Sequence, residues 1–350
     1  MSASNSAPRV LLIGPYSYVG GVSVHMKRLA CILDKDFDIG ILDDAPAHIS
    51  GGPHNIRVWR QLPGNIRYIG LHDIIHIHTG NWILRVGMIL LSIVMGKKII
   101  VTMHSYRLAG ISRTITRLLL RLVDHVICVN EIIDRSVVGR SKFLKEAFIP
   151  PVGAGCGLPE ALEQFIRDNE DRSILCANAF RLSEYQGDDL YGLNQCIEVA
   201  KIARDKQERI VIVFVVGRVD PGDHLYFKST NEISDHELSE YIHVVPYSVD
   251  FVELIRRSDV VLRPTLTDGD ALTVREAIFL DKPVIASDVV PRPEGTYLYR
   301  AGDASDLYRV IKKVLSGEAS RDSFSASSSV GEMEEYRNFY GHIYRMCVAH

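Results

Sequence analysis

Long apolar runs are missing from this chain of 350 residues, which argues against a protein that spans a membrane. The most apolar stretch, residues 82–96, contains Arg85 and is shorter than the roughly 20 residues that a bilayer-crossing helix needs. We expect a buried helix there instead. The first residues are polar and lack the apolar core of a secretory signal, so we expect a cytoplasmic protein.

Cysteine is scarce as well: the chain has six cysteines, and none of them forms a C-x-x-C pair. Such pairs are typical of zinc sites and redox motifs, so their absence disfavours both kinds of site. The irregular spacing indicates reduced thiols, as in proteins of the cytosol. His76 and His78 fall on one face of a predicted strand, but neither their spacing nor their neighbours indicate a metal triad, and we expect no metal ion.

Net charge is small, at −3, but the two parts of the chain differ in sign. Residues 1–150 contain 18 basic and 10 acidic residues, whereas the rest of the chain contains 22 and 33. This asymmetry indicates that the first part meets an anionic partner. We do not expect a nucleic acid in that role, because the basic residues lack interleaved aromatic side chains and form no recognisable binding module.

Short apolar runs bounded by turn residues alternate with helical patterns along the first half of the chain. Such runs are typical of strands in a parallel sheet. We predict strands over residues 9–13, 37–42, 74–77, 98–102 and 125–129. We predict helices over residues 22–33, 82–95 and 111–122. Strands that alternate with helices in this way indicate an α/β fold.

A second series of the same kind follows residues 149–159, which are rich in proline and glycine and are typical of a linker. We predict its strands over residues 173–179, 210–216, 242–245, 260–263 and 284–287. We predict its helices over residues 194–203, 252–256, 272–280 and 304–315. A serine-rich linker at residues 324–329 precedes a last predicted helix at 331–346. The chain therefore contains two Rossmann-like halves.

The loop GPYSYVGG, residues 14–21, connects the first predicted strand to the first predicted helix. Ligands of parallel sheets bind at the carboxyl ends of the strands, where this loop lies. Gly20 and Gly21 would let the backbone approach a ligand, and amides at a helix N-terminus favour an anion. The spacing differs from G-x-G-x-x-G, so a dinucleotide is not indicated. A tight turn without a ligand is the alternative interpretation.

His104 ends another predicted strand, in the segment VTMHS. A polar side chain at this end of a strand can face a ligand crevice rather than the core. We interpret His104 as a candidate site residue, and its alternative role is that of a hydrogen-bonded histidine at a strand end.

The most informative segment covers residues 263–288, where a predicted strand leads through an acidic loop into a helix. Asp268 lies in the loop, and Glu276 lies eight residues later, in the first turns of the helix. Two carboxylates near a helix N-terminus can accept hydrogen bonds from hydroxyls, and nearby backbone amides can hold phosphate. The amides concerned belong to Gly269, Asp270, Ala271, Leu272 and Thr273. This combination suits a sugar nucleotide, and helix capping by Asp268 or Asp270, with Glu276 in solvent, is the alternative.

This segment resembles the donor-binding motif of retaining family 4 (group 1) glycosyltransferases, in which two glutamates stand eight residues apart ahead of a Pro-Val-Ile-Ala-Ser-Asp strand. Other segments resemble the family pattern and occur in the same order along the chain: Gly20-Gly21, the Val-Thr-Met-His segment at 101–104 and the Ile-Pro-Pro segment at 149–151. The resemblance covers nearly the whole chain, and it is to members of the bacterial surface-polysaccharide type.

The resemblance implies the GT-B fold, an α/β fold with two Rossmann-like parallel-sheet domains facing each other across a cleft. Residues 1–158 would form the acceptor-binding domain, and residues 159–330 would form the nucleotide-sugar-binding domain. Residues 331–350 would form a C-terminal helix that crosses back to pack on the first domain.

Carried over by position, the resemblance also implies roles for single residues. Glu276 would bind the ribose hydroxyls, and Asp268 would hold hydroxyls of the transferred sugar. The pair Gly20-Gly21 would approach the donor phosphates, and His104 would lie beside the reacting sugar. Arg181 matches the basic residue that neutralises the diphosphate.

Two positions depart from the family pattern. The first carboxylate is Asp268 rather than glutamate, and it is one methylene shorter. The diphosphate lysine, expected a few residues after Arg181 and just before a glycine, has no match, and Tyr191-Gly192 stands in its place. Arg181 would then carry most of the charge compensation, with Lys282 or Arg263 helping.

The function implied by the resemblance is transfer, with retention, of a sugar from a nucleotide donor to a saccharide or lipid-linked acceptor in polysaccharide biosynthesis. The donor is a co-substrate, and neither a cofactor nor a metal is expected. Two other functions stay open. A sugar-nucleotide 2-epimerase of the same fold would need no acceptor, and a non-catalytic sugar-nucleotide-binding protein would tolerate the missing lysine.

Part of the positive charge of the first half is concentrated in the predicted helix at 111–122. Arg113, Arg117 and Arg121 recur at every fourth residue and share one helix face, and Arg107 lies just before them. A basic amphipathic helix can lie on an anionic membrane, which would make the protein peripheral. A solvated face on a core helix is the alternative.

Overall fold

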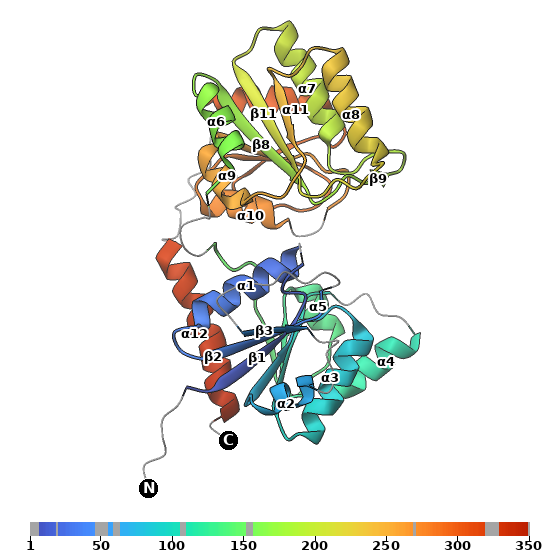
Figure 1. The fold of residues 1–350 in the computed structure, drawn as a ribbon, viewed down its shortest axis with the longest axis vertical. Helices are drawn as coiled ribbons and strands as arrows, with labels where there is room; N and C mark the ends of the chain where they lie inside the picture. The colour runs from blue at the N-terminus through green and yellow to red at the C-terminus, as the bar shows by residue number, and fades with distance from the viewer. Residues whose placement is uncertain are drawn as a thin grey trace. The chain divides into compact units, whose positions relative to one another are not determined.

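The computed structural model describes residues 7–18, 20–45, 55–58, 64–105, 110–151, 157–268, 271–318 and 329–348. The chain forms two compact units, one of Met1–Val152 with Ser328–His350 and the other of Gly153–Ser327. Each unit contains a parallel sheet with helices on both faces (Figure 1). In the part of the chain that is described, no helix combines the length and apolar character needed to cross a bilayer.

The first unit is built on a seven-stranded parallel sheet in the order β3-β2-β1-β4-β5-β6-β7. The strands are β1 (Arg9–Gly14), β2 (Asp38–Asp43), β3 (Asn55–Val58), β4 (Ile74–Ile77), β5 (Lys98–Met103), β6 (His125–Cys128) and β7 (Lys142–Leu144). The central strands are runs of buried aliphatic residues because helices cover both faces of the sheet. The strand order reverses between β1 and β4, which makes their carboxyl ends the topological switch point.

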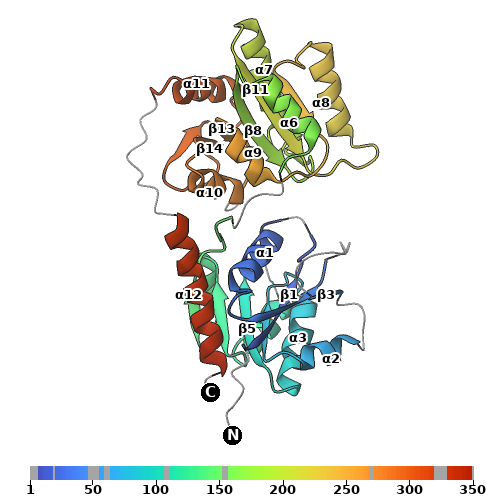
Figure 2. The ribbon, with the colours of Figure 1, turned by 60° about the vertical axis from the view of Figure 1, so that its left-hand side comes forward.

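Different helices cover the two faces of the first sheet. One face is covered by α1 (Gly21–Leu33) and by the C-terminal helix α12 (Ser329–Val348), whose Tyr340 and Tyr344 are fully buried against α1 and β1 (Figure 2). The other face is covered by α2 (Gly64–Gly70), α3 (Trp82–Val94), α4 (Gly110–Leu119) and α5 (Glu131–Ser136). The last segment of the chain is therefore part of the first unit.

The second unit is built on a six-stranded parallel sheet in the order β12-β11-β8-β13-β14-β15. The strands are β8 (Ser173–Ala179), β11 (Ile210–Val216), β12 (Ile242–Val245), β13 (Val260–Arg263), β14 (Val284–Ser287) and β15 (Thr296–Tyr299). A small antiparallel pair, β9 (Glu184–Tyr185) and β10 (Asp188–Asp189), follows β8. The switch point of this sheet lies between β8 and β13.

Three helices cover each face of the second sheet. α7 (Leu193–Asp205), α8 (His224–Asp235) and α11 (Ala304–Leu315) pack on one face. α6 (Glu160–Asp168), α9 (Phe251–Arg257) and α10 (Leu272–Phe279) pack on the other. The two Rossmann-like sheets and the C-terminal helix predicted from the sequence are thereby confirmed.

Two differences from the sequence predictions concern exposure and short elements. The helix predicted to be buried, α3, leaves Ile83, Leu90 and Val94 exposed along one face. Several elements were not predicted, among them β7, β15 and α8. The five cysteines within the described residues are free thiols, as the sequence predicts.

Candidate functional site

Basic side chains gather at the switch point of the second sheet. Arg181 lies two residues beyond the end of β8 and is exposed. Arg263 is the last residue of β13. Since β8 and β13 are hydrogen-bonded neighbours, both arginines lie at the carboxyl edge of the sheet, where open α/β folds bind ligands.

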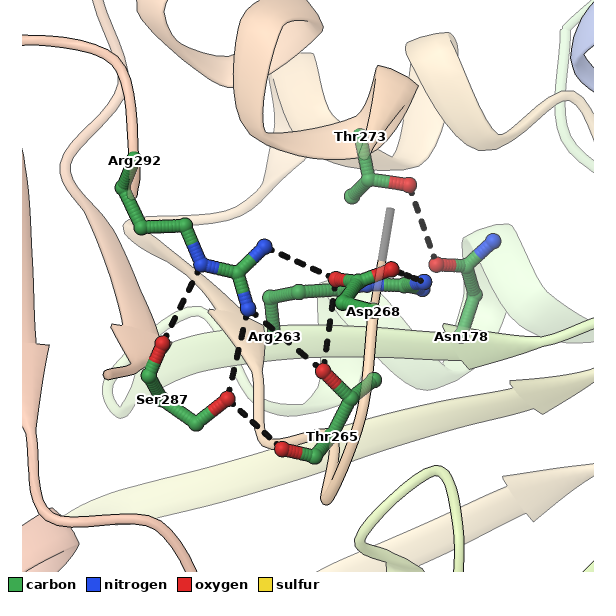
Figure 3. Close-up of polar contacts among 7 residues, drawn as sticks. All are labelled: Asn178, Arg263, Thr265, Asp268, Thr273, Ser287 and Arg292. Carbon is green, nitrogen blue, oxygen red and sulfur yellow. Dashed lines mark hydrogen bonds and ion pairs between the residues drawn. The ribbon is translucent and has the colours of Figure 1, made fainter. Parts of the chain in front are cut away.

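Asp268 lies between two arginine side chains (Figure 3). Nε and Nη2 of Arg263 donate to its two carboxylate oxygens at 2.9 Å each, and Nη1 of Arg292 donates to Oδ2 at 2.8 Å. Thr265 Oγ1 donates to the same Oδ2 at 3.3 Å. The side chains of Arg292, Asp268 and Arg263 are only 2, 7 and 14% exposed, so this is a buried ion cluster.

The rest of the Arg292 guanidinium is tied to the end of β14. Its Nε donates to the Ser287 carbonyl at 3.1 Å, and its Nη2 lies 3.3 Å from Ser287 Oγ. Ser287 Oγ in turn donates to the Thr265 carbonyl at 2.6 Å. Arg292 therefore connects the loop after β13 to the neighbouring strand β14. Arg263 binds Asp268 through Nε and Nη2 alone.

The electrostatics of this cluster keep Asp268 ionised. Burial by itself would raise the pKa of its carboxyl group, but the hydrogen bonds and charges of Arg263 and Arg292 outweigh burial and lower it. Every Asp268 oxygen already accepts from an arginine, so a sugar hydroxyl would have to share or displace these contacts. The predicted contact of Asp268 with the transferred sugar stays a prediction.

Helix α10 begins just after this cluster. Its N-cap residue is Ala271, whose own side chain makes no capping hydrogen bond. Capping by Asp268 stays an alternative prediction, and Asp270, the other candidate cap, lies outside the described residues. Thr273 Oγ1, in the first turn, donates to Asn178 Oδ1 of β8 at 3.2 Å (Figure 3). Glu276 lies one turn further and is buried rather than solvated. Of the predicted phosphate-binding amides, those of Gly269 and Asp270 lie outside the described residues. Those of Leu272 and Thr273 belong to the first two residues of α10.

Tyr191 and Gly192, at the start of α7, both make close contacts with the end of β13 and the residue after it. Gly192 is the N-cap of α7 at φ 78°, and a Cβ there would come within 2.0 Å of the Pro264 carbonyl oxygen. The Tyr191 ring lies 5.8 Å from the Arg263 guanidinium. Asp189 binds the backbone amides of Tyr191 and Leu193. These contacts bring the start of α7 to the same edge of the sheet as Arg263.

A second glycine, Gly187, also follows Arg181 and offers another position for the missing lysine. Gln186-Gly187 forms the turn between β9 and β10, with both residues at positive φ. It lies five residues beyond Arg181, nearer than Tyr191-Gly192. Neither position carries a positive charge, so the positive charge at this edge comes from arginines, Arg181, Arg263 and Arg292 among them.

Histidines gather at the switch point of the first sheet. His78 follows β4, His104 follows β5, and His25 comes from α1. His78 Nδ1 and His104 Nε2 are 3.2 Å apart, and the His25 ring centroid is 4.8 Å from that of His104. His25 was not predicted as a site residue, although a histidine among the apolar residues of α1 is a visible signal.

All three of these histidines are neutral near pH 7. Burial lowers the pKa of His25 to about 4, and burial also lowers the pKa values of His78 and His104 well below the ordinary value. His25 Nδ1 lies 2.7 Å from the Ala147 carbonyl and donates to it, while His25 Nε2 and His78 Nε2 are buried without a partner. One nitrogen from each ring lies within 4.8 Å of the others, a spacing from which a metal ion could be held.

The structure thus divides the predicted site residues between two units. Gly20 and Gly21 begin α1, which also carries His25, so they belong with His104 to the first unit. Arg181, Tyr191, Asp268, Thr273 and Glu276 belong to the second unit. Arg292 was missed, although the Pro-Arg-Pro-Glu-Gly segment at 291–295 just beyond the end of β14 marks a turn at the ligand edge of the sheet.

The buried ion cluster predicts a large loss of stability for Asp268→Asn. This change leaves two buried guanidinium groups without their carboxylate, and we expect it to lower the free energy of unfolding by about 3–5 kcal/mol. The matched control is Asp171→Asn, which removes an exposed ion pair with Arg209 and should cost less than about 1 kcal/mol. Scanning calorimetry compares the two variants, and equal losses would contradict the cluster.

The histidine cluster predicts that the first unit loses stability as the pH falls from about 6.5 to 4. The folded pKa of His25 lies below that of the unfolded chain, so the unfolded chain takes up the proton first. Between pH 7 and 5 this histidine should account for about 2 kcal/mol. Both tryptophans of the chain lie in the first unit, so urea titrations followed by their fluorescence report on it.

In that experiment His25→Asn is the comparison, because its amide can donate to the Ala147 carbonyl but does not titrate. We expect a shallower loss of stability for this variant between pH 7 and 5. An identical pH profile would show that His25 is not buried in its neutral form.

A family model described as "Glycosyl transferases group 1" matches residues 186–329, which include Arg263, Asp268, Glu276 and Arg292. No curated protein sequence is significantly similar to the chain.

Several solved structures share the fold of the whole chain at low sequence identity. HepE of Anabaena, solved in complex with UDP, has a TM-score of 0.71 at 12% identity, over 97% of this chain and 100% of that one. A glycosyltransferase of Rickettsia africae ESF-5 has a TM-score of 0.68 at 13% identity, over 98 and 99%. Sucrose-phosphate synthase of Thermosynechococcus elongatus has a TM-score of 0.59 at 16% identity, over 98 and 99%. The second unit is thus similar to the group 1 glycosyl transferases, and the chain as a whole has the GT-B fold of these structures.

Proposed function

We propose that this protein is a glycosyltransferase that takes its sugar from a nucleoside diphosphate sugar bound at the carboxyl edge of the second sheet. The observation that carries the proposal is the placement of Arg181 and Arg263 at the carboxyl ends of the neighbouring strands β8 and β13, where the chain leads into α10. A diphosphate is bound by cations and by the amides at a helix N-terminus, and this edge offers two arginines and the first turn of α10.

In this proposal, different residues bind different parts of the donor. Arg181 and Arg263 neutralise the diphosphate, and Asp268 orients Arg263 through its two-point contact. Glu276 binds the ribose hydroxyls from the second turn of α10. The proposed role of His104, in the first unit, is to contact the reacting sugar together with the Gly20-Gly21 turn.

The reaction breaks the bond between the anomeric carbon and the diphosphate oxygen and forms a bond from that carbon to an acceptor oxygen. The growing negative charge on the diphosphate is stabilised by the arginines and by the amides of α10, so the proposal needs no metal ion. Retention of configuration and a saccharide or lipid-linked acceptor of polysaccharide biosynthesis follow from the family resemblance. HepE, solved with UDP and with UDP-glucose, supports uridine diphosphate sugars as the first donors to test.

The proposal also places the protein in a reducing compartment such as the cytoplasm. Cys128, Cys176, Cys196 and Cys347 are buried free thiols, and burial raises the pKa of Cys128 to about 11 and that of Cys176 to about 12. Thiols of this kind are inert packing residues and need no oxidising environment.

Substitutions at Glu276 and Arg181 test the proposed donor site. Glu276→Gln should lower donor turnover at least a hundredfold, because an uncharged group replaces the acceptor of two ribose hydroxyls. Arg181→Gln should raise the KM for the donor tenfold to a hundredfold, by loss of a charge-assisted contact of about 1.5–3 kcal/mol. Release of UDP from uridine diphosphate sugars, with saccharide and lipid-linked acceptor pools and an excess of chelator, is the measurement.

Two control variants separate this effect from loss of folding or of charge. Glu240 is exposed, and Arg209 precedes β11 at the amino edge of the same sheet, so Glu240→Gln and Arg209→Gln should keep normal turnover. Near-normal turnover of Glu276→Gln would remove Glu276 from the site. Turnover that requires added divalent cation would contradict a metal-free reaction, and conversion of the donor without acceptor would favour an epimerase.

A further inference from the structure

The outward side of α3 in the first unit is an apolar stripe. Ile83, Leu90 and Val94 recur at a helical spacing that places them on one face, opposite the buried Leu84, Met88 and Ile89. Val94 is 85% exposed and Ile83 is 64% exposed. These side chains leave aliphatic surface exposed, and exposing such surface to water is unfavourable.

Helix α4 extends this apolar surface. α3 and α4 lie against each other, and both pack onto the same hydrophobic cluster on one face of the first sheet (Figure 1). Their outward sides therefore point away from the sheet in the same sense. On α4 and the turn after it, Ile111, Leu118 and Leu122 are exposed, at 75, 55 and 58%. We call this joint surface of the two helices the α3–α4 face.

A row of arginines runs beside the apolar residues of α4. Arg113 and Arg117 stand one turn apart on the helix, Arg121 follows in the next turn, and all three are exposed. No acidic residue occurs in the sequence between positions 82 and 123. The α3–α4 face therefore combines exposed aliphatic side chains with positive charge that no neighbouring acid of either helix offsets. Arg107, grouped with these arginines from the sequence, lies outside the described residues.

This composition distinguishes between the possible occupants of the face. A solvated helix face explains the arginines but not the aliphatic stripe on α3. A second copy of the chain, docked by two-fold symmetry, would set the arginine row against itself without an acid to pair with. An anionic lipid surface satisfies both features, because its phosphates pair with arginines and its acyl boundary accepts aliphatic side chains.

We propose that the α3–α4 face docks the first unit onto an anionic membrane surface. Ile83, Leu90 and Val94 enter the boundary between headgroups and acyl chains, and Arg113, Arg117 and Arg121 pair with lipid phosphates. The contact is that of a peripheral protein whose helices lie on the surface. The inference rests on the exposed residues of the first unit and does not depend on the proposed donor site.

The test measures binding of the full chain to sedimented vesicles. Vesicles of phosphatidylcholine with 30% phosphatidylglycerol should bind the protein, and vesicles of phosphatidylcholine alone should bind it far less. Each basic side chain near an anionic surface strengthens binding about fivefold, so the triple variant Arg113→Gln/Arg117→Gln/Arg121→Gln should weaken it roughly a hundredfold. A second variant, Leu90→Ser/Val94→Ser/Leu118→Ser, should weaken binding at least tenfold while leaving the charge unchanged.

The matched control is Arg67→Gln/Arg140→Gln/Arg345→Gln, which removes three exposed arginines from the same unit but from outside the face. It should keep most of the binding, and all three variants should unfold at the temperature of the original protein. Equal binding losses in the two arginine variants would show a general charge effect and overturn the proposal. Absent vesicle binding, or a dimer that the serine variant dissociates, would also overturn it.

Discussion

A single carboxylate, Asp268, holds two buried guanidinium groups at the carboxyl edge of the second sheet, next to the strands where the strand order reverses. This ion cluster connects the loop after β13 to the end of β14 through Arg292, and it fixes the Arg263 side chain at the end of β13. Helix α10 begins four residues later, so the geometry of the proposed phosphate site depends on the same contacts. Removing one partner would leave a buried charge unpaired, which is why the three residues act as a unit.

Much of the fold could be predicted from sequence because its strands are short aliphatic runs, buried on both faces and bounded by turns. β1, β4 and β13 are of this kind, and helices with one apolar stripe, such as α11, were equally visible. Short or weakly patterned elements were missed, since the exposed strand β7 and helix α8 carry little periodic signal. The face that α3 leaves exposed was not predicted either, because nearly every residue of that helix is apolar.

The candidate site was predictable only where its residues are close in sequence. Asp268 and Glu276 share one loop and helix, so their spacing was informative. Arg292 lies 24 residues from Asp268, and His25 is 79 residues from His104. Only the parallel strand order brings such residues together, and periodicity does not reveal which side chains meet at a switch point.

The central claim is that the second unit binds a nucleoside diphosphate between the end of β8 and the start of α10. Hydrogen–deuterium exchange of the full chain, with and without UDP, tests it most directly. We predict slower exchange in residues 180–193 and 271–279, where the amides and Arg181 would meet the diphosphate. Exchange that UDP leaves unchanged in these segments, or slows only in the first unit, would contradict the account.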